Sequence, residues 1–198
     1  MVETPEYDSD RIFNVPNSLC AIRLVGSFVL FWLAVTGSDI SFLVAFVAFA
    51  ATDWIDGKLA ILLHQRTEFG ARLDSVADAA LYSATIFGIF WRKWDVIQLY
   101  SPWIVVAVIS YGLTSVAGLI KFGRVPSYHT YAAKVSAYFA FMAVICLFSG
   151  WANWPVLAAS VAVTLTNLEA TVMTIILPRW ISDLRSVVHA YDCRRQIS

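Results

Sequence analysis

Four aspartates lie within the segment TDWIDGKLAILLHQRTEFGARLDSVAD, residues 52–78. This segment covers the end of one strongly apolar stretch, a short polar break and the start of the next apolar stretch. On an α-helix, Asp53 and Asp56 share one face, and Asp74 and Asp78 follow each other one turn apart on the next helix. A tight turn between the two helices lets these two pairs face each other. Converging carboxylates call for cations, and all-oxygen ligands favour hard ions such as Mg²⁺ or Mn²⁺. Four such ligands in a small space suit two divalent cations, an arrangement associated with phosphoryl transfer.

Small residues accompany both pairs of aspartates. Gly57 and Ala60 share the face of the first pair, and Gly70 begins the stripe that continues with Asp74 and Asp78. They leave room for a bulky group to approach the helix backbones. Solvated or snorkelling aspartates are the alternative, but an aspartate inside a bilayer costs about 2.5–3.5 kcal/mol and its side chain is too short to snorkel well. The pattern therefore favours a binding site.

The rest of the chain has the composition of a membrane protein. Of its 198 residues, 59% are hydrophobic and 14% are charged, whereas soluble domains carry about 25% charged residues. Six apolar stretches approach the roughly 20 residues that cross a bilayer; they cover residues 18–36, 41–63, 71–91, 103–120, 131–150 and 155–177. Lipid requires such segments to be helical. We predict an all-α integral membrane protein with six transmembrane helices and short loops, the longest break being residues 92–102.

The ends of the chain and the basic residues suggest an orientation. We expect one domain over residues 1–198, an interfacial segment before the first span and a helical tail after the last. Acidic residues precede the first apolar run, unlike the basic start of a signal peptide, so this span is expected to remain as an anchor. Basic residues gather on the side of both termini, and only Arg92 and Lys93 lie on the other side. Both termini, the tail and the acidic layer are therefore expected to be cytoplasmic, in a bacterial inner membrane or an equivalent plasma membrane.

A second group of charges lies near the start of the fifth span. Lys121 and Arg124 are explained equally well by an ordinary basic loop, whereas Lys134 lies inside the apolar run. Cations here suit an acceptor that carries a phosphate. The net charge of zero and the lack of a basic run interleaved with aromatics argue against a nucleic-acid partner.

The sequence does not determine which groups surround three further residues. Arg23, one turn into the first span, could point to the aspartates or to lipid headgroups. Glu169, near the middle of the last span, is expected to face other helices, but the sequence indicates no partner for it. Cys20 is interpreted as a small buried apolar residue, because no CxxC or Cys/His spacing is present.

The acidic segment resembles the signature of the CDP-alcohol phosphatidyltransferases. The pattern DWIDGKLAILLHQRTEFGARLDSVAD matches it at four aspartates, two glycines and one alanine over 26 residues. The stretch NVPNSLCAIRLV before and within the first span is similar to the start of the phosphatidylglycerophosphate synthases in that family. The six-helix pattern is also that of the family, so the resemblance extends over nearly the whole chain.

The resemblance implies transfer of a phosphatidyl group from CDP-diacylglycerol to a small alcohol, with release of CMP, during phospholipid synthesis in contact with membrane lipids. It implies two ions, Mg²⁺ or Mn²⁺, on the four aspartates, with Asp78 also acting as general base. Gly57, Ala60 and Gly70 are then assigned to donor binding, and a homodimer is expected. Glycerol 3-phosphate is favoured as acceptor, while inositol phosphate and other alcohols stay open. A cation- or proton-coupled transporter is the alternative of another class, but its acids would more often lie in two related halves with broken helices.

One position departs from the family pattern. The family has an arginine after the alanine, where it is taken to hold the phosphates of the donor, and this chain has Ile61. We expect Lys58 or Arg72 to replace that charge. A family member without catalytic activity is the alternative that Ile61 raises.

Overall fold

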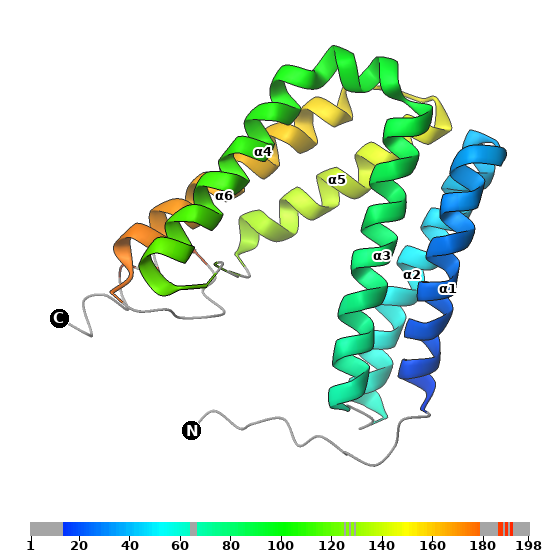
Figure 1. The fold of residues 1–198 in the computed structure, drawn as a ribbon, viewed down its shortest axis with the longest axis horizontal. Helices are drawn as coiled ribbons and strands as arrows, with labels where there is room; N and C mark the ends of the chain where they lie inside the picture. Colours follow the sequence, from blue (N-terminus) through cyan, green and yellow to red (C-terminus); the bar gives the residue numbers. More distant parts are fainter. Residues whose placement is uncertain are drawn as a thin grey trace. The chain divides into compact units, whose positions relative to one another are not determined.

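The computed structural model describes residues 14–63, 67–124, 126, 128, 130–178, 186, 187, 189 and 191, without the side chains of residues 53, 54, 56–61 and 68. Over these residues the chain forms six α-helices and no strand, which confirms the predicted all-α class. The helices are α1 (Val15–Thr36), α2 (Asp39–Leu62), α3 (Glu68–Arg92), α4 (Trp94–Phe122), α5 (Tyr131–Ser149) and α6 (Pro155–Ile176) (Figure 1). Most of the predicted interfacial segment and most of the predicted tail lie outside the described residues.

Five of these helices are long and apolar enough to cross a membrane: α1, most of α3, α4, α5 and α6. The apolar part of α2 is shorter and covers Asp39–Thr52, because the acidic segment begins immediately after it. Many large apolar side chains are exposed on the helices, among them Phe28 at 68% and Ile120 at 82%. Contact with lipid hydrocarbon accounts for such surfaces, so the helices fit an integral membrane protein. The count of six spans and the cytoplasmic termini remain predictions.

The predicted break at residues 92–102 is wrong. Only Lys93 separates α3 from α4, and Pro102 lies inside α4. Proline lacks the N–H that would donate to the Gln98 carbonyl one turn earlier. The Ser101 hydroxyl donates to this carbonyl instead, at 2.8 Å. The helix therefore passes through a proline and a run of mixed polarity that resemble a loop in the sequence.

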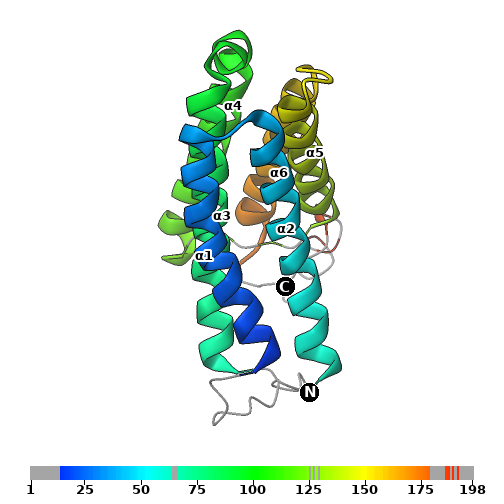
Figure 2. The same cartoon turned by 90° about the vertical axis from the view of Figure 1, so that its right-hand side faces the viewer.

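The helices divide into two compact units, residues 1–94 and residues 95–198. In the first unit, α1 and α3 run in the same direction and α2 is antiparallel to both (Figures 1 and 2). Two glycines let α2 approach its neighbours closely, because a Cβ on Gly26 of α1 would lie 2.3 Å from the Phe49 ring and one on Gly88 of α3 would lie 2.4 Å from the Phe42 ring. Small residues have the same use in membrane helix packing generally.

A charged cluster fixes the end of this unit where α1 joins α2. The two oxygens of Asp39 lie 2.6 Å from Arg92 Nε and 2.6 Å from Lys93 Nζ. Arg92 Nη1 also donates to the carbonyls of Ala34, at 3.2 Å, and Gly37, at 2.9 Å. The cluster therefore ties the start of α2 and the end of α1 to the end of α3.

In the second unit, α5 is antiparallel to α4 and α6 (Figure 1). Polar contacts join α4 to α6: Asn167 Nδ2 donates to Ser110 Oγ at 2.9 Å, and the hydroxyls of Thr114 and Thr171 lie 2.7 Å apart. Hydrogen bonds of this kind hold helices together where the surrounding lipid offers no hydrophobic driving force.

Candidate active site

Asp74 and Asp78 occupy one face of α3, as the sequence predicts. The helix begins at Glu68 because the Thr67 side chain caps it, accepting the Gly70 N–H at 2.9 Å. The Asp74 side chain is 43% exposed and the Asp78 side chain is 31% exposed. Both carboxylates are thus partly accessible, although they lie on a helix that is apolar enough to span a bilayer.

Arg23 of α1 joins both carboxylates. Its Nη1 atom lies 3.1 Å from Asp74 Oδ1 and 2.5 Å from Asp78 Oδ1, and its side chain is fully buried. The sequence leaves two directions open for the Arg23 side chain, and in the structure it points toward the aspartates. The pairing neutralises one of two carboxylate charges that lie only one helical turn apart.

Two residues beside Arg23, Asp74 and Asp78 are not predicted as site residues from the sequence. Cys20 is buried, as expected, but its thiol also donates to Asp74 Oδ1 at 3.6 Å. Asn17 is 5% exposed, and its Nδ2 atom donates to Thr67 Oγ1 at 3.3 Å. A Cβ on Gly70 would lie 2.3 Å from Asn17 Oδ1. The available signal was spacing, because Cys20 and Arg23 lie three residues apart and so share a helix face.

The capping of α1 places these residues. The Asn14 side chain accepts the Asn17 N–H at 2.8 Å, and Pro16 lies in the first turn, where a proline costs no helical hydrogen bond. Asn14 is itself buried. The NVPN sequence therefore starts α1 beside the start of α3. One turn further along its length, α1 comes within reach of the carboxylates.

The packing of α2 indicates where the other two aspartates lie along the helix bundle. Phe49 contacts Gly26, and α1 and α2 run antiparallel. Moving one turn from Phe49 to residue 53 on α2 therefore corresponds to moving back from Gly26 to Arg23 on α1. Helical geometry therefore predicts that the backbone of residue 53 lies near the level of Arg23. The side chains of Asp53, Asp56, Gly57, Lys58, Ala60 and Ile61 lie outside the described residues.

The chemistry of the described acids suits a hard divalent cation. Asp74 and Asp78 offer carboxylate oxygens, which Mg²⁺ and Mn²⁺ prefer, and both are partly exposed. Among the side chains that the structure describes, no three His, Cys, Asp or Glu residues come together as a ligand group. The pair on α3 is therefore half of the predicted set, and the other half is on α2.

The predicted acceptor cations belong to the second unit, near the turn between α4 and α5. The Lys121 ammonium donates to the Ile175 carbonyl near the end of α6 at 2.7 Å. Arg124 is exposed after α4. Lys134 is exposed in the first turn of α5, whose start is capped by buried Thr130 through the Ala133 N–H at 3.1 Å. Lys121 thus has a structural contact that the sequence does not reveal.

Glu169 has a partner far along the chain. Its Oε1 atom accepts the Val187 N–H at 3.4 Å, and Val187 also packs against the buried pair Met173 and Leu177. Among the described residues, the buried Oε2 atom has no hydrogen-bond partner. The prediction that Glu169 faces protein is thus consistent with its contact, and the segment after α6 supplies that contact.

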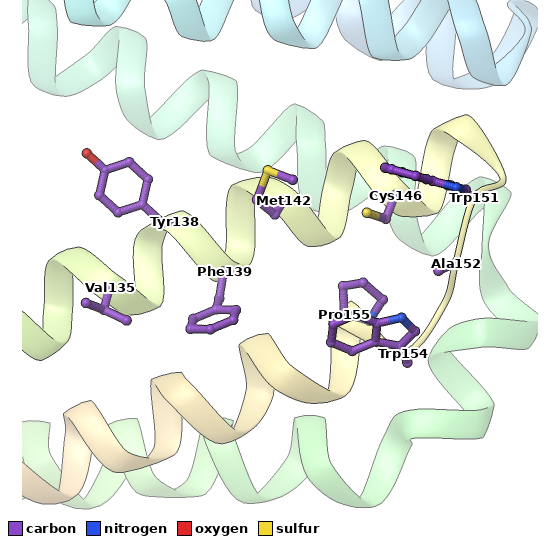
Figure 3. Close-up of a pocket in the computed structure, with 9 residues that line it drawn as sticks. All are labelled: Val135, Tyr138, Phe139, Met142, Cys146, Trp151, Ala152, Trp154 and Pro155. Carbon is purple, nitrogen blue, oxygen red and sulfur yellow. The ribbon is translucent and has the colours of Figure 1, made fainter.

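An apolar groove of about 670 Å³ runs along α5 to the turn before α6 (Figure 3). Phe139, Met142 and Pro155 are among its lining residues, and Trp151 and Trp154 lie at its end. No charged side chain lines it, so it lacks the carboxylates that would hold a divalent cation. Tryptophans at a helix end are typical of membrane interfaces. We therefore assign the chemistry to the acidic group of the first unit rather than to this groove.

Comparison with known proteins agrees with the geometry. The family description of CDP-alcohol phosphatidyltransferases matches residues 13–167. The chain is 47% identical over 72 residues to proteins of Escherichia coli strain K12 and Shigella flexneri serotype 5b, each named CDP-diacylglycerol--glycerol-3-phosphate 3-phosphatidyltransferase. This segment is 35% of the chain, and it spans only 40% of the length of each relative. No solved structure matches the chain. Because the family match covers well over half of the 198 residues, the protein belongs to the CDP-alcohol phosphatidyltransferase family.

Proposed function

We propose that this protein transfers a phosphatidyl group from CDP-diacylglycerol to glycerol 3-phosphate and releases CMP. Its family and the names of its relatives support this proposal. The observation that carries it is the pair of partly exposed carboxylates, Asp74 and Asp78, which lie one turn apart on α3 and are bridged by a buried guanidinium. Such a pair has few uses inside an apolar helix other than binding a cation or a proton.

The four aspartates are proposed to hold two divalent cations, Mg²⁺ or Mn²⁺. When bound, these ions would neutralise the diphosphate of the donor and the charge that develops on departing CMP. The hard oxygens and exposure of Asp74 and Asp78 support this assignment. The contact of Phe49 with Gly26 predicts that residue 53 lies near the level of Arg23, which supports a contribution from Asp53 and Asp56 on α2.

In the proposed reaction, the acceptor hydroxyl oxygen forms a bond to the phosphorus of the lipid phosphate. The bond from that phosphorus to the oxygen of CMP breaks, and CMP leaves with the electron pair. Asp78 takes the proton of the hydroxyl. A general base must be accessible and well oriented, and Asp78 is partly exposed while Arg23 holds one of its oxygens.

Donor binding is proposed for Gly57, Ala60 and Gly70, with Lys58 or Arg72 supplying the charge that Ile61 lacks. Arg72 is exposed in the second turn of α3, which is compatible with this role. The protein is proposed to act as a homodimer with its site and both termini on the cytoplasmic side.

For the acceptor, we propose that its phosphate binds near Lys134, with Lys121 and Arg124 in support. Lys134 is exposed in the first turn of α5, where the helix dipole also attracts anions. Lys121 is the weaker candidate because its ammonium already donates to Ile175.

The test is to incubate purified protein with CDP-diacylglycerol, Mg²⁺ and single acceptors, and to identify the lipid product by mass spectrometry. Glycerol 3-phosphate should yield phosphatidylglycerol phosphate, and glycerol or inositol phosphate should yield much less product. A dominant product from inositol phosphate would change the proposed acceptor. Failure to bind CDP-diacylglycerol and to form any product would favour a non-catalytic role.

A further inference from the structure

Arg23 is unusual because a charged side chain is enclosed completely. Its exposed fraction is 0%, and arginine is almost never fully buried unless it is paired. It belongs to a buried stripe on α1 that also includes Cys20, Ser27 and Leu30. The Ser27 hydroxyl donates to the Arg23 carbonyl at 2.9 Å, within the helix. Arg23 is therefore held in the interior of the first unit, on the face that meets α3.

Two contacts of Arg23 with the aspartates share one nitrogen. Nη1 bridges Asp74 Oδ1 and Asp78 Oδ1 at 3.1 and 2.5 Å. Without this bridge, two like charges would lie one turn apart, and each aspartate would be less restricted in its side-chain rotamer. The bridge thus limits both the repulsion between the carboxylates and their freedom to rotate.

The exposure of the three side chains is asymmetric. Asp74 and Asp78 are 43% and 31% exposed, whereas Arg23 is enclosed behind them. An incoming cation or diphosphate therefore meets the carboxylates and not the guanidinium. This excludes Arg23, in the described arrangement, as a direct substitute for the phosphate-binding arginine that Ile61 replaces.

We propose that Arg23 is a positioning residue that orients Asp74 and Asp78 for cation binding from the buried side. The proposal rests on the proposed function, because it assumes that the two aspartates are cation ligands. Partners behind metal ligands commonly contribute 10- to 100-fold to metal affinity. Removing Arg23 also removes a positive charge, which by itself would favour cation binding. We expect the loss of orientation to outweigh this gain, because both aspartates must serve the same site.

The experiment is a titration of the purified protein with Mn²⁺, followed by electron paramagnetic resonance of the free ion, without donor or acceptor. Arg23→Met should weaken Mn²⁺ binding about 10- to 100-fold. Arg23→Lys should recover part of the affinity, because a single nitrogen makes both contacts in the parent protein. Ser27→Ala is the matched control, since Ser27 is also buried on α1 and, among the described residues, its hydroxyl donates to the Arg23 carbonyl and not to a carboxylate. It should bind Mn²⁺ like the parent protein.

The outcomes separate this inference from the proposed function. A parent protein that binds no Mn²⁺ removes the proposed metal site itself. A parent protein that binds Mn²⁺, with Arg23→Met binding as tightly or more tightly, overturns the positioning role alone. Thermal unfolding identifies variants that do not fold. Should Arg23→Met be among them, Arg23→Gln replaces it, retaining an N–H donor without the charge, and parent-like affinity in that variant equally overturns the role.

Discussion

Gly70 belongs to the family signature and is also closely packed against other residues. The substitution Gly70→Ala can distinguish a role in donor binding from a role in packing. The resemblance assigns Gly70 to donor binding, whereas in the structure the Asn17 side chain occupies the space beside it. A Cβ at this position would lie 2.3 Å from Asn17 Oδ1 and 2.9 Å from Thr67 Oγ1. Asn17 has little room to withdraw, because it is 5% exposed and its amide donates to Thr67.

The cost of Gly70→Ala follows from these contacts. Overpacking a close-packed position costs about 1–3 kcal/mol, and displacing the Thr67 cap adds about 0.5–1 kcal/mol. Alanine recovers up to about 1 kcal/mol because it favours the helix more than glycine does. The net loss is therefore about 0.5–4 kcal/mol. At roughly 2–4 °C per kcal/mol for a chain of this size, the melting temperature should fall by roughly 1–16 °C.

The assay is thermal unfolding in detergent, together with CDP-diacylglycerol binding to the folded protein. Adding Asn17→Ala to Gly70→Ala should restore part of the lost stability, because the shorter side chain makes room for the new methyl group. Gly112→Ala in α4 is the control, since a Cβ there meets no atom within 4 Å, and it should be neutral or slightly stabilising. A Gly70→Ala variant with parent-like stability that fails to bind the donor would refute the packing argument and support the donor assignment.

Other predictions concern the ligands, the acceptor and the charged cluster at the far end of the first unit. Asp74→Asn should abolish phosphatidyl transfer, and excess chelator should do the same to the parent protein; full activity in chelator would refute metal dependence. Lys134→Ala should raise the KM for glycerol 3-phosphate about tenfold or more with little change in the donor KM, because a charge-assisted contact contributes about 1.5–3 kcal/mol; a preference for glycerol over its phosphate would contradict this. Burial raises the pKa of Asp39, but hydrogen bonds and charges from Lys93 and Arg92 outweigh burial and leave it below its ordinary value of 3.8. The stabilisation that ionised Asp39 gives to the folded protein is thus present above pH 3.8, and it is lost as the pH falls through the lower pKa that Asp39 has in the folded state. The free energy of unfolding in acid should therefore depend less steeply on pH in Asp39→Asn than in the parent protein.

Much of the fold could be predicted because lipid leaves the backbone few choices. An apolar run must satisfy its hydrogen bonds internally, so it becomes a helix whatever its neighbours are. The predicted fifth segment, residues 131–150, differs from α5 (Tyr131–Ser149) by one residue. This rule does not apply where a segment is partly polar. For this reason, the helical structure at the start of α4 was not predicted from the sequence. There, a single side-chain contact from Ser101 to Gln98 compensates for Pro102.

The candidate site was less predictable, because it depends on which faces of the helices meet. Helical spacing was enough to place Asp74 and Asp78 on one face. It could not tell which face of α1 meets α3, since α1 is apolar nearly all round, and so the direction of Arg23 stayed open. The contact of Lys121 with Ile175 spans 54 residues of sequence and leaves no local signal. Such pairings arise only when the helices pack.

The position of the acidic group thus depends on two kinds of contact between the same helices. The contact of Phe49 with Gly26 sets how far α2 slides along α1, and a slip by one turn would move residue 53 by about 5.4 Å relative to Arg23. The bridge from Arg23 to Asp74 and Asp78 sets how the carboxylates of α3 are oriented. The cations that we propose to be shared by α2 and α3 would need both conditions, because carboxylates that are well oriented but one turn out of register cannot reach the same ion. We therefore expect changes at Gly26 to affect cation binding although this residue carries no ligand, and changes at the Asp39 cluster to affect mainly stability, because that cluster lies at the opposite end of the same three helices.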